Sequence, residues 1–232
     1  MKNLTSYISE KMVYTKANSK YFPKTKEELK EIIEKLVNKQ SAEDIINLNS
    51  IDTSEITDMS DLFDEMEGLV KINISDWDVS KVKRMDYMFR CCANLEKIIG
   101  IEDWDVSKVE NMQGMFDGCK LFNQNISKWN VSKVENMASM FYECTSFNQP
   151  LDDWNVSNVE DMSWLFSECE KFNQDISSWN VFRVTYMTGM FDNCKSFNQD
   201  ISKWNVSNVT DTNRTSMFYK CPIEEKYKPK FK

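Results

Sequence analysis

Cysteine is the residue of this chain whose chemistry is easiest to recognise, because thiolates bind metals, act as nucleophiles and form disulfides. Six of the seven cysteines recur three residues after a phenylalanine, namely Cys92, Cys119, Cys144, Cys169, Cys194 and Cys221. None of them forms the Cys-x-x-Cys spacing of zinc and redox sites. We interpret the six as a buried structural column, with disulfides as the alternative. Cys91 is out of phase, and we expect it to be exposed and reactive.

Histidine is absent from the 232 residues. This removes Ser-His and Cys-His nucleophilic pairs and His-bound zinc. Paired carboxylates such as Asp152 with Asp153, or Asp103 with Asp105, could perform acid–base catalysis. They recur with the repeat described next, whereas a catalytic site usually breaks a pattern. We therefore expect no enzyme activity, no cofactor and no metal site, since no segment has the loop pattern of a calcium site.

A repeat of about 25 residues must position these side chains. Its most regular marker is a tryptophan, found at Trp77, Trp104, Trp129, Trp154, Trp179 and Trp204. The first interval is 27 residues and the other four are 25. Each tryptophan begins Trp-Asn/Asp-Val, and Met-Phe or Leu-Phe follows about eleven residues later. A degenerate copy beginning at Ile51 gives seven turns in all.

Each repeat carries signals for a short strand and a short helix. The segment Ile126-x-x-Trp129-x-Val131 alternates in hydropathy at its end, which predicts a strand. The next segment, Ser132-Lys133-Val134-Glu135, has the form of a helix capping box. Apolar residues then recur at helical spacing at Val134, Met137, Phe141 and Cys144. The segment ending in Phe-Asn-Gln is the predicted loop. Because one such unit buries too little apolar surface alone, the sequence predicts an α/β solenoid of about seven stacked strand–helix turns.

We expect the solenoid to span residues 48–221, between an N-terminal helical cap over residues 1–47 and a basic C-terminal tail over residues 222–232. Within the cap, a capping box at Thr25 and a helical apolar pattern predict an amphipathic helix over residues 26–38. This helix should cover the open end of the first turn. A further short helix is predicted from Leu4, Tyr7, Ile8 and Met12.

The charge is −8 overall, and the acidic side chains are concentrated in the repeats, where residues 48–219 carry a net −13. This balance disfavours nucleic acids and anionic membranes, and it favours a protein partner with a basic surface, or plain solubility. No window has the length and hydropathy of a membrane span. The N-terminus lacks the apolar core of a secretory signal. We therefore expect a cytoplasmic protein, with a virion component as the alternative.

The phrase Phe-Asn-Gln-x-Ile-Ser-x-Trp-Asn-Val-Ser-x-Val-x-x-Met-x-x-Met-Phe-x-x-Cys resembles the repeats of the BspA-like leucine-rich repeat family, over roughly residues 50–221. The resemblance implies a leucine-rich-repeat-like α/β solenoid that acts as a scaffold for protein–protein interaction. In surface members of that family the role is adhesion. The alternatives to a non-catalytic binding module are therefore a surface adhesin exported without a classical signal, and a structural or accessory protein of a phage particle.

A polar residue follows each tryptophan and should point away from the core, because side chains alternate along a strand. The six are Asp78, Asp105, Asn130, Asn155, Asn180 and Asn205. We interpret them as a polar ladder on the outer surface. It is either a binding surface or a set of side chains that satisfies neighbouring backbone groups.

Three aromatic residues, Trp164, Phe182 and Tyr186, occupy variable positions where most turns have Ser, Asn, Asp or Gly. On the predicted helices these positions lie opposite the buried stripe. Phe182 replaces the predicted capping serine, which should cost about 1 kcal/mol. The pattern predicts an exposed aromatic patch that binds a partner, with Tyr87 and Tyr142 as further members. Local packing or a contact between two copies of the chain is the alternative.

Overall fold

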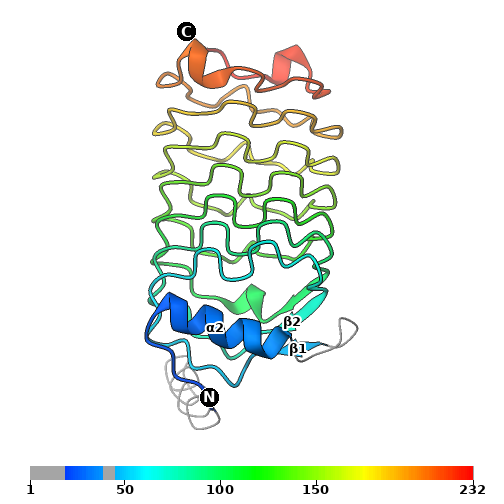
Figure 1. Ribbon diagram of the computed structural model, residues 1–232. Coiled ribbons are helices and arrows are strands. Elements are labelled where there is room, and N and C mark those ends of the chain that lie inside the picture. The colour runs from blue at the N-terminus through cyan, green and yellow to red at the C-terminus, as the bar shows by residue number, and fades with distance from the viewer. Residues whose placement is uncertain (1–18, 39–44, 232) are drawn as a thin grey trace, which may run out of the picture.

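The computed structural model describes residues 19–38 and 45–231. The chain winds through stacked coils, with helix α2 (Lys26–Val37) lying across the N-terminal end (Figure 1). One phenylalanine per coil forms a column of stacked rings through the interior, with centroids 5.1 to 5.9 Å apart. The column consists of Phe63, Phe89, Phe116, Phe141, Phe166, Phe191 and Phe218. The repeat in the sequence is therefore a repeat in space.

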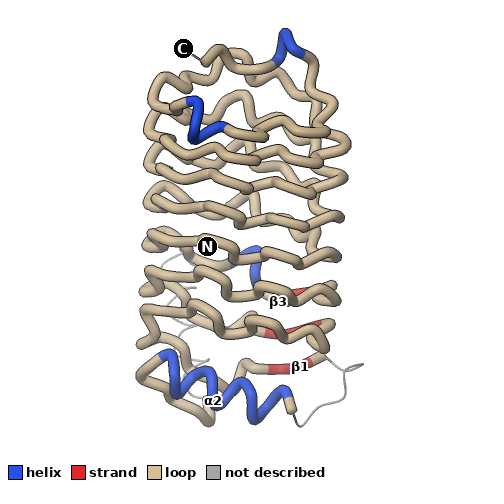
Figure 2. Tube along the Cα trace, turned by 45° about the horizontal axis from the view of Figure 1, so that its top comes forward, coloured by secondary structure: helices blue, strands red, loops and turns tan. Residues whose placement is uncertain are grey.

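Regular secondary structure is sparse, as Figure 2 shows. Within residues 19–38 and 45–231, three short strands form a parallel sheet in the order β1-β2-β3, and they are β1 (Ile46–Asn47), β2 (Lys71–Asn73) and β3 (Lys97–Ile99). The same residues contain three short 3₁₀ turns, η1 (Ile101–Asp103), η2 (Asp211–Arg214) and η3 (Glu225–Tyr227). In the described part of the chain, no helix is both long and apolar enough to cross a membrane.

The prediction of a helix in every repeat is wrong, because the described repeats contain no α-helix. Residues 137–144 instead form two consecutive four-residue turns, each closed by an N–H···O bond of 3.0 to 3.1 Å between its first and last residues. The third residue of each turn, Ser139 and then Glu143, has a positive φ of 57° and 54°. A left-handed residue at that place is the mark of a type II turn and is incompatible with a continuing helix.

The strand predicted around each tryptophan is also absent. Trp129 donates its backbone N–H to the carbonyl of Ile126 at 3.1 Å, so this segment is a turn as well. Neighbouring coils are joined in parallel at single bridges that align Asn136 with Asn111 and with Asp161. The expected parallel stacking is therefore confirmed. Turns replace both the predicted strand and the predicted helix, because apolar residues three apart also fit the two ends of a turn.

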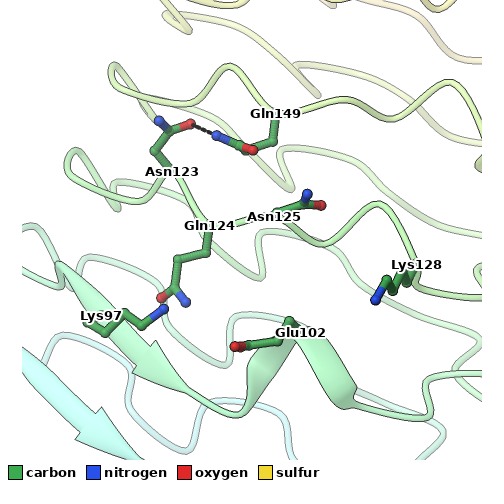
Figure 3. A pocket seen from close by; sticks show the side chains of 7 residues that line it. All are labelled: Lys97, Glu102, Asn123, Gln124, Asn125, Lys128 and Gln149. Atoms are coloured by element: carbon green, nitrogen blue, oxygen red, sulfur yellow. Dashed lines mark hydrogen bonds between the residues drawn. The ribbon is translucent and has the colours of Figure 1, made fainter.

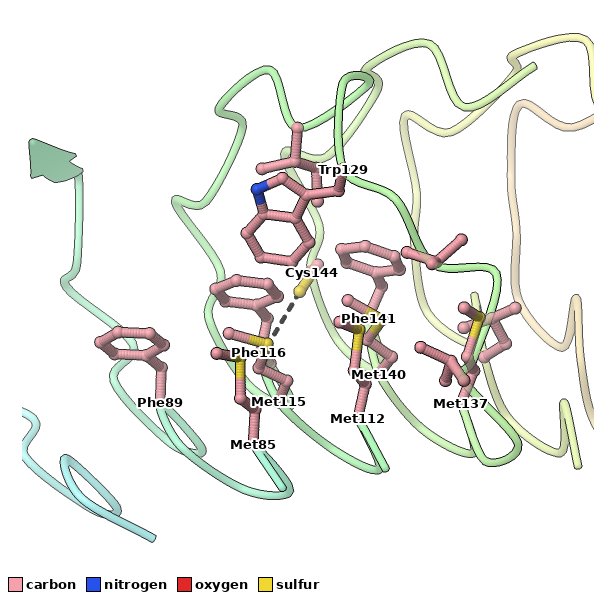
Figure 4. Packing of buried hydrophobic residues seen from close by; sticks show 14 of the residues in the cluster. Met85, Phe89, Met112, Met115, Phe116, Trp129, Met137, Met140, Phe141 and Cys144 are labelled. Atoms are coloured by element: carbon pink, nitrogen blue, oxygen red, sulfur yellow. Dashed lines mark hydrogen bonds between the residues drawn. The ribbon is translucent and has the colours of Figure 1, made fainter. Parts of the chain in front are cut away.

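The interior consists of sulfur and aromatic columns side by side (Figure 4). The Cys144 thiol donates to the carbonyl of Phe116 in the preceding coil at 3.0 Å, and Cys92, Cys119, Cys169 and Cys194 make the same contact with their preceding coils. Burial raises the pKa of Cys92 to about 12. All seven cysteines are free, and only Cys91 is exposed. The predicted buried column is confirmed for five of its six cysteines, whereas Cys221 is only partly buried, and the disulfide alternative is not confirmed.

The predicted cap helix is confirmed. It spans Lys26–Val37, and the cap residue Thr25 accepts Glu28 N–H at its Oγ1 at 3.2 Å, as a capping box requires. The Glu28 side chain reaches back one residue further than the cap, where its Oε2 accepts Lys24 N–H at 2.6 Å. The fully buried side chains of Leu29 and Ile33 join the core of the solenoid. The further helix predicted from Leu4 to Met12 lies outside the described residues. Residues 46–47, predicted within the cap, pair with β2 and so belong to the first coil.

The C-terminal segment, predicted as a basic tail, packs on the last coil as far as residue 231. Ile223 is buried, and the carbonyl of Tyr227 accepts the N–H of Ile201 at 3.0 Å. The Arg214 guanidinium lies 4.3 Å from the centre of the Phe231 ring. This segment therefore covers the C-terminal end of the solenoid, as α2 covers the other end.

Candidate interaction surface

Phe182 and Tyr186 lie on the outer surface of one coil, with 50% and 49% of their surface exposed. The residue midway between them, Val184, is fully buried and anchors this segment to the core. The prediction that these two aromatic side chains are exposed is confirmed, although they lie on turns and not on the predicted helices. We call Phe182 and Tyr186 the aromatic pair.

Trp164 does not join the pair, because its ring packs on the next coil. A Cβ added to Gly189 would lie 2.4 Å from the Trp164 ring, and one added to Gly114 would lie 2.5 Å from the Tyr87 ring. Both aromatic residues have a positive φ, 59° at Trp164 and 57° at Tyr87. Each ring thus lies over a glycine of the following coil and is only partly exposed. For these two residues the local-packing alternative is the better description.

Tyr142 is also only partly exposed. It lies beside Glu143, and partial burial raises the pKa of its phenol. Tyr87 has a guanidinium neighbour, since Arg90 lies 5.2 Å from its ring centre. Of the five predicted partner-binding residues, the structure leaves two, Phe182 and Tyr186, as strongly exposed neighbours on one coil.

The predicted polar ladder has a structural role within each coil. Each of its six side chains accepts the backbone N–H two residues further on, at 2.9 to 3.3 Å, which is the bond of an Asx turn. Phe182 N–H makes this bond with Asn180 at 3.2 Å, as a serine does in the other coils. The predicted cost of losing a serine cap is therefore wrong, because the capping side chain belongs to Asn180.

A second set of Asx turns occurs at the position that Tyr186 occupies in its own coil. At the position of Tyr186, four of the five earlier coils have side chains that accept the N–H two residues on at 2.8 to 3.0 Å, and these are Asp58, Asn111, Asn136 and Asp161. The remaining coil has Arg84 at this position. Tyr186 aligns with Asp161 in a parallel bridge, but a phenol cannot reach its own backbone in this way. Tyr186 therefore replaces a turn-stabilising side chain with an exposed ring.

Sequence reasoning missed the role of the Phe-Asn-Gln segment. The Asn148 side-chain oxygen accepts the N–H of Asn173 at 3.0 Å and the amide of Gln174 at 2.8 Å, and the adjoining coils repeat these contacts. This asparagine ladder joins coils on the side where no strand pairing continues beyond β3. The recurrence of asparagine at one place in successive repeats was the signal that could have revealed this ladder.

The pKa values of two neighbouring side chains, Asp117 and Cys91, are raised above their ordinary values. Burial, assisted by Glu143, raises the pKa of Asp117 to about 6. Partial burial and Asp117 also raise the pKa of the exposed Cys91 thiol, which disfavours the reactive thiolate at neutral pH. The expectation that Cys91 is exposed is confirmed, whereas its expected reactivity gains no support from this setting. Within the described residues, no three His, Cys, Asp or Glu side chains form a group able to hold a metal.

A family model described as a Mycoplasma protein of unknown function, DUF285, matches the chain twice, over residues 29–150 and 122–228. The two overlapping matches extend from the first turn of α2 to the C-terminal segment. The chain belongs to the DUF285 family. No curated protein and no solved structure matches it.

The two DUF285 matches contain different surface features of the chain. The first contains the sheet and the 27-residue interval between Trp77 and Trp104, whereas the aromatic pair lies only in the second. The second match consists largely of coils with the regular 25-residue spacing. The aromatic pair is therefore a departure within the most regular part of this DUF285 protein.

Proposed function

We propose that this DUF285 protein is a non-catalytic protein-binding module, a scaffold of the BspA-like leucine-rich repeat type, whose contact surface is centred on the aromatic pair. The observation that carries the proposal is the exposure of Phe182 and Tyr186, 50% and 49%, at positions where the other coils have polar side chains and no aromatic ring. Exposed aromatic clusters with a polar surround are characteristic of binding hot spots.

The surroundings of the pair support this role. Arg183 lies between the two rings in sequence and is held by Glu160 at 2.7 Å and by Asn158 Oδ1 at 3.0 Å. These contacts fix a polar rim beside the rings, and the buried Val184 holds the segment in place. A preorganised surface binds with less loss of conformational entropy. The net charge of −13 over the repeats favours a partner with basic groups around an apolar contact.

The test replaces both rings with the residues of the neighbouring coils, Phe182→Ser with Tyr186→Asn. Leu121→Asn is the matched control, because Leu121 is a similarly exposed apolar side chain, at 44%, on another coil. A partner is identified by crosslinking from the native source, purified, and titrated against each variant. We expect the double variant to bind at least tenfold more weakly, with an unfolding midpoint no lower than that of the wild type, while the control binds normally.

Equal affinity of the double variant and the wild type would contradict the proposal, as would an equal loss in the Leu121 variant. Sedimentation of the purified wild-type chain provides the other decisive result. If the aromatic pair only joins two copies of the chain, the wild type sediments as a dimer and the double variant as a monomer. That outcome would overturn the proposal of a separate partner.

A further inference from the structure

Several asparagines of the solenoid are followed, two residues further on, by a serine or a threonine. This Asn-x-Ser/Thr triplet is the acceptor pattern for N-linked sugars when its middle residue is not proline. Within the described residues the triplets begin at Asn73, Asn125, Asn130, Asn155, Asn205, Asn208 and Asn213. Because the pattern is short, the surroundings of each side chain must decide which asparagines are able to react.

The fold does not require both ends of the triplet. In the polar ladder the side-chain oxygen accepts the backbone N–H two residues on, and the aspartates Asp78 and Asp105 do this as well as the asparagines. At Asn180 the donating N–H belongs to Phe182, which has no hydroxyl. The turn therefore needs a side-chain oxygen and a backbone N–H, but neither the amide nitrogen of asparagine nor the hydroxyl of serine.

In four triplets these two remaining groups are accessible. The asparagine is exposed, and its side-chain oxygen accepts the serine N–H at 2.9 to 3.3 Å. Neither the asparagine Nδ2 nor the serine Oγ of these triplets forms a hydrogen bond with any described residue. The four, which we call the acceptor asparagines, are Asn125, Asn130, Asn155 and Asn205.

The other three triplets have side chains that join neighbouring coils. Asn208 Nδ2 donates to a carbonyl of the preceding coil at 2.7 Å, and Asn213 Nδ2 donates to another at 3.1 Å. Asn73 is only partly exposed, and its side-chain oxygen accepts the amide of Asn49 in the preceding coil at 3.2 Å. Contacts within the fold therefore occupy these asparagines, whereas the acceptor asparagines are left with a free nitrogen.

Hollows in the surface leave room for an added group beside three of the acceptor asparagines. Asn130 and Asn155, on neighbouring coils, line a hollow of about 400 Å³, and Asn125 lines another of about 420 Å³. Both volumes are within the range of sites for small molecules, about 300 to 1,000 Å³. In Figure 3 the dashed line joins Asn123 to Gln149, and the Asn125 amide makes no bond to the other side chains drawn.

We propose that the acceptor asparagines are sites of N-linked glycosylation. The donor is a sugar whose anomeric carbon is activated as a phosphate ester, and a separate glycosyltransferase catalyses the transfer. The asparagine Nδ2 forms a bond to the anomeric carbon while the bond from that carbon to the phosphate oxygen breaks. The nitrogen gives one proton to a base of the transferase, and the phosphate group leaves. The free serine hydroxyl is the second feature that the transferase recognises.

The first test uses the chain purified from its native source, with its peptides sequenced by mass spectrometry under fragmentation that keeps sugars attached. We expect sugar on the acceptor asparagines and none on Asn208 or Asn213. A single sugar unit would indicate a nucleotide-activated donor, and a preassembled chain of sugars a lipid-linked donor, so either supports the proposal. Unmodified acceptor asparagines would overturn it, as would equal modification of Asn208 and Asn213.

The second test uses variants produced in the same source. Ser157→Ala removes the hydroxyl but keeps the N–H that Asn155 accepts, so the turn should persist as it does at Phe182, and Asn155 should lose its sugar. Ser157→Thr is the matched control, in which Asn155 should keep it.

Phe182→Ser tests the same rule by gain of a site and does not depend on the function proposed for the aromatic pair. It completes an Asn-Val-Ser triplet at the exposed Asn180, which should then acquire a sugar, whereas Phe182→Ala should leave Asn180 unmodified. The proposal is overturned if Asn155 remains modified in Ser157→Ala, or if Asn180 remains unmodified in Phe182→Ser.

Discussion

Replacing Phe141 with alanine is expected to lower the free energy of unfolding by about 3 to 5 kcal/mol. The Phe141 ring is fully buried, lies 4.2 Å from the Phe147 ring, and stacks on Phe116 at 5.9 Å and on Phe166 at 5.7 Å. Its removal opens a cavity that is shared by three successive coils. Because each coil of a solenoid is stabilised by its neighbours, both interfaces of the central coil are weakened together.

Urea unfolding measures this effect, and Phe182→Ala is the matched control. It deletes the same atoms from a half-exposed ring, so we expect a change of less than about 1 kcal/mol. Similar losses in the two variants would show that Phe141 is not part of a packed interior column. If Phe141→Ala lowers the urea midpoint but leaves the m-value unchanged, the variant still unfolds from the same folded state as the wild type.

Replacing Gly100 with alanine is expected to lower the free energy of unfolding by about 2 to 4 kcal/mol. A Cβ at this position would lie 2.3 Å from Ser75 Cα and 2.9 Å from Ser75 N, and these backbone atoms cannot rotate away. The φ of 95° adds strain for any side chain. The added methyl group must therefore displace the longer coil from the coil beneath it.

Gly68→Ala is the matched control for this substitution. No atom lies within 4 Å of a Cβ built at Gly68, and its φ is not positive. Alanine there should leave stability unchanged or raise it by about 0.4 to 1 kcal/mol, because it restricts the unfolded chain. Equal thermal midpoints for the two variants would mean that the coil of Gly100 does not approach Ser75 as the structure has it.

The repeat period and the identity of the buried residues could be predicted from the sequence, because burial imposes the same side chains at the same place in every coil. Trp129, Phe141 and Cys144 were assigned to the core for this reason, and they are buried. The α-helix over residues 26–38 was also predictable to within one residue, because its capping box and apolar face are local signals.

The helices of the repeats were not predictable by periodicity alone, since apolar residues three apart satisfy consecutive turns as well as a helix. The distinguishing signal was the placement of glycine. Of only five glycines in the chain, Gly114, Gly118 and Gly189 occupy the two left-handed positions of the turns. Glycine is unfavourable inside a helix but well suited to a positive φ.

The candidate surface was predictable only in part. Exposure of Phe182 and Tyr186 followed from the repeat, because the equivalent residues of other coils are polar. The exposure of Trp164 depends on Gly189 in the next coil, over which its ring packs. The position of Trp164 within its own repeat does not reveal this contact between coils.

The central claim is that the repeats consist of turns whose third residue has a positive φ. It is tested most directly by the effect of Ser139→Gly on the free energy of unfolding in urea. Ser139 has a φ of 57°, so glycine relieves its strain, and we expect stability to rise by about 0.5 to 1 kcal/mol after the entropic cost of glycine. The neighbouring Ala138, which is 8% exposed and has no positive φ, is the control, and Ala138→Gly should lower stability. If this segment were a helix, Ser139→Gly would lower stability by about 0.5 to 1 kcal/mol as well, and that result would contradict the account.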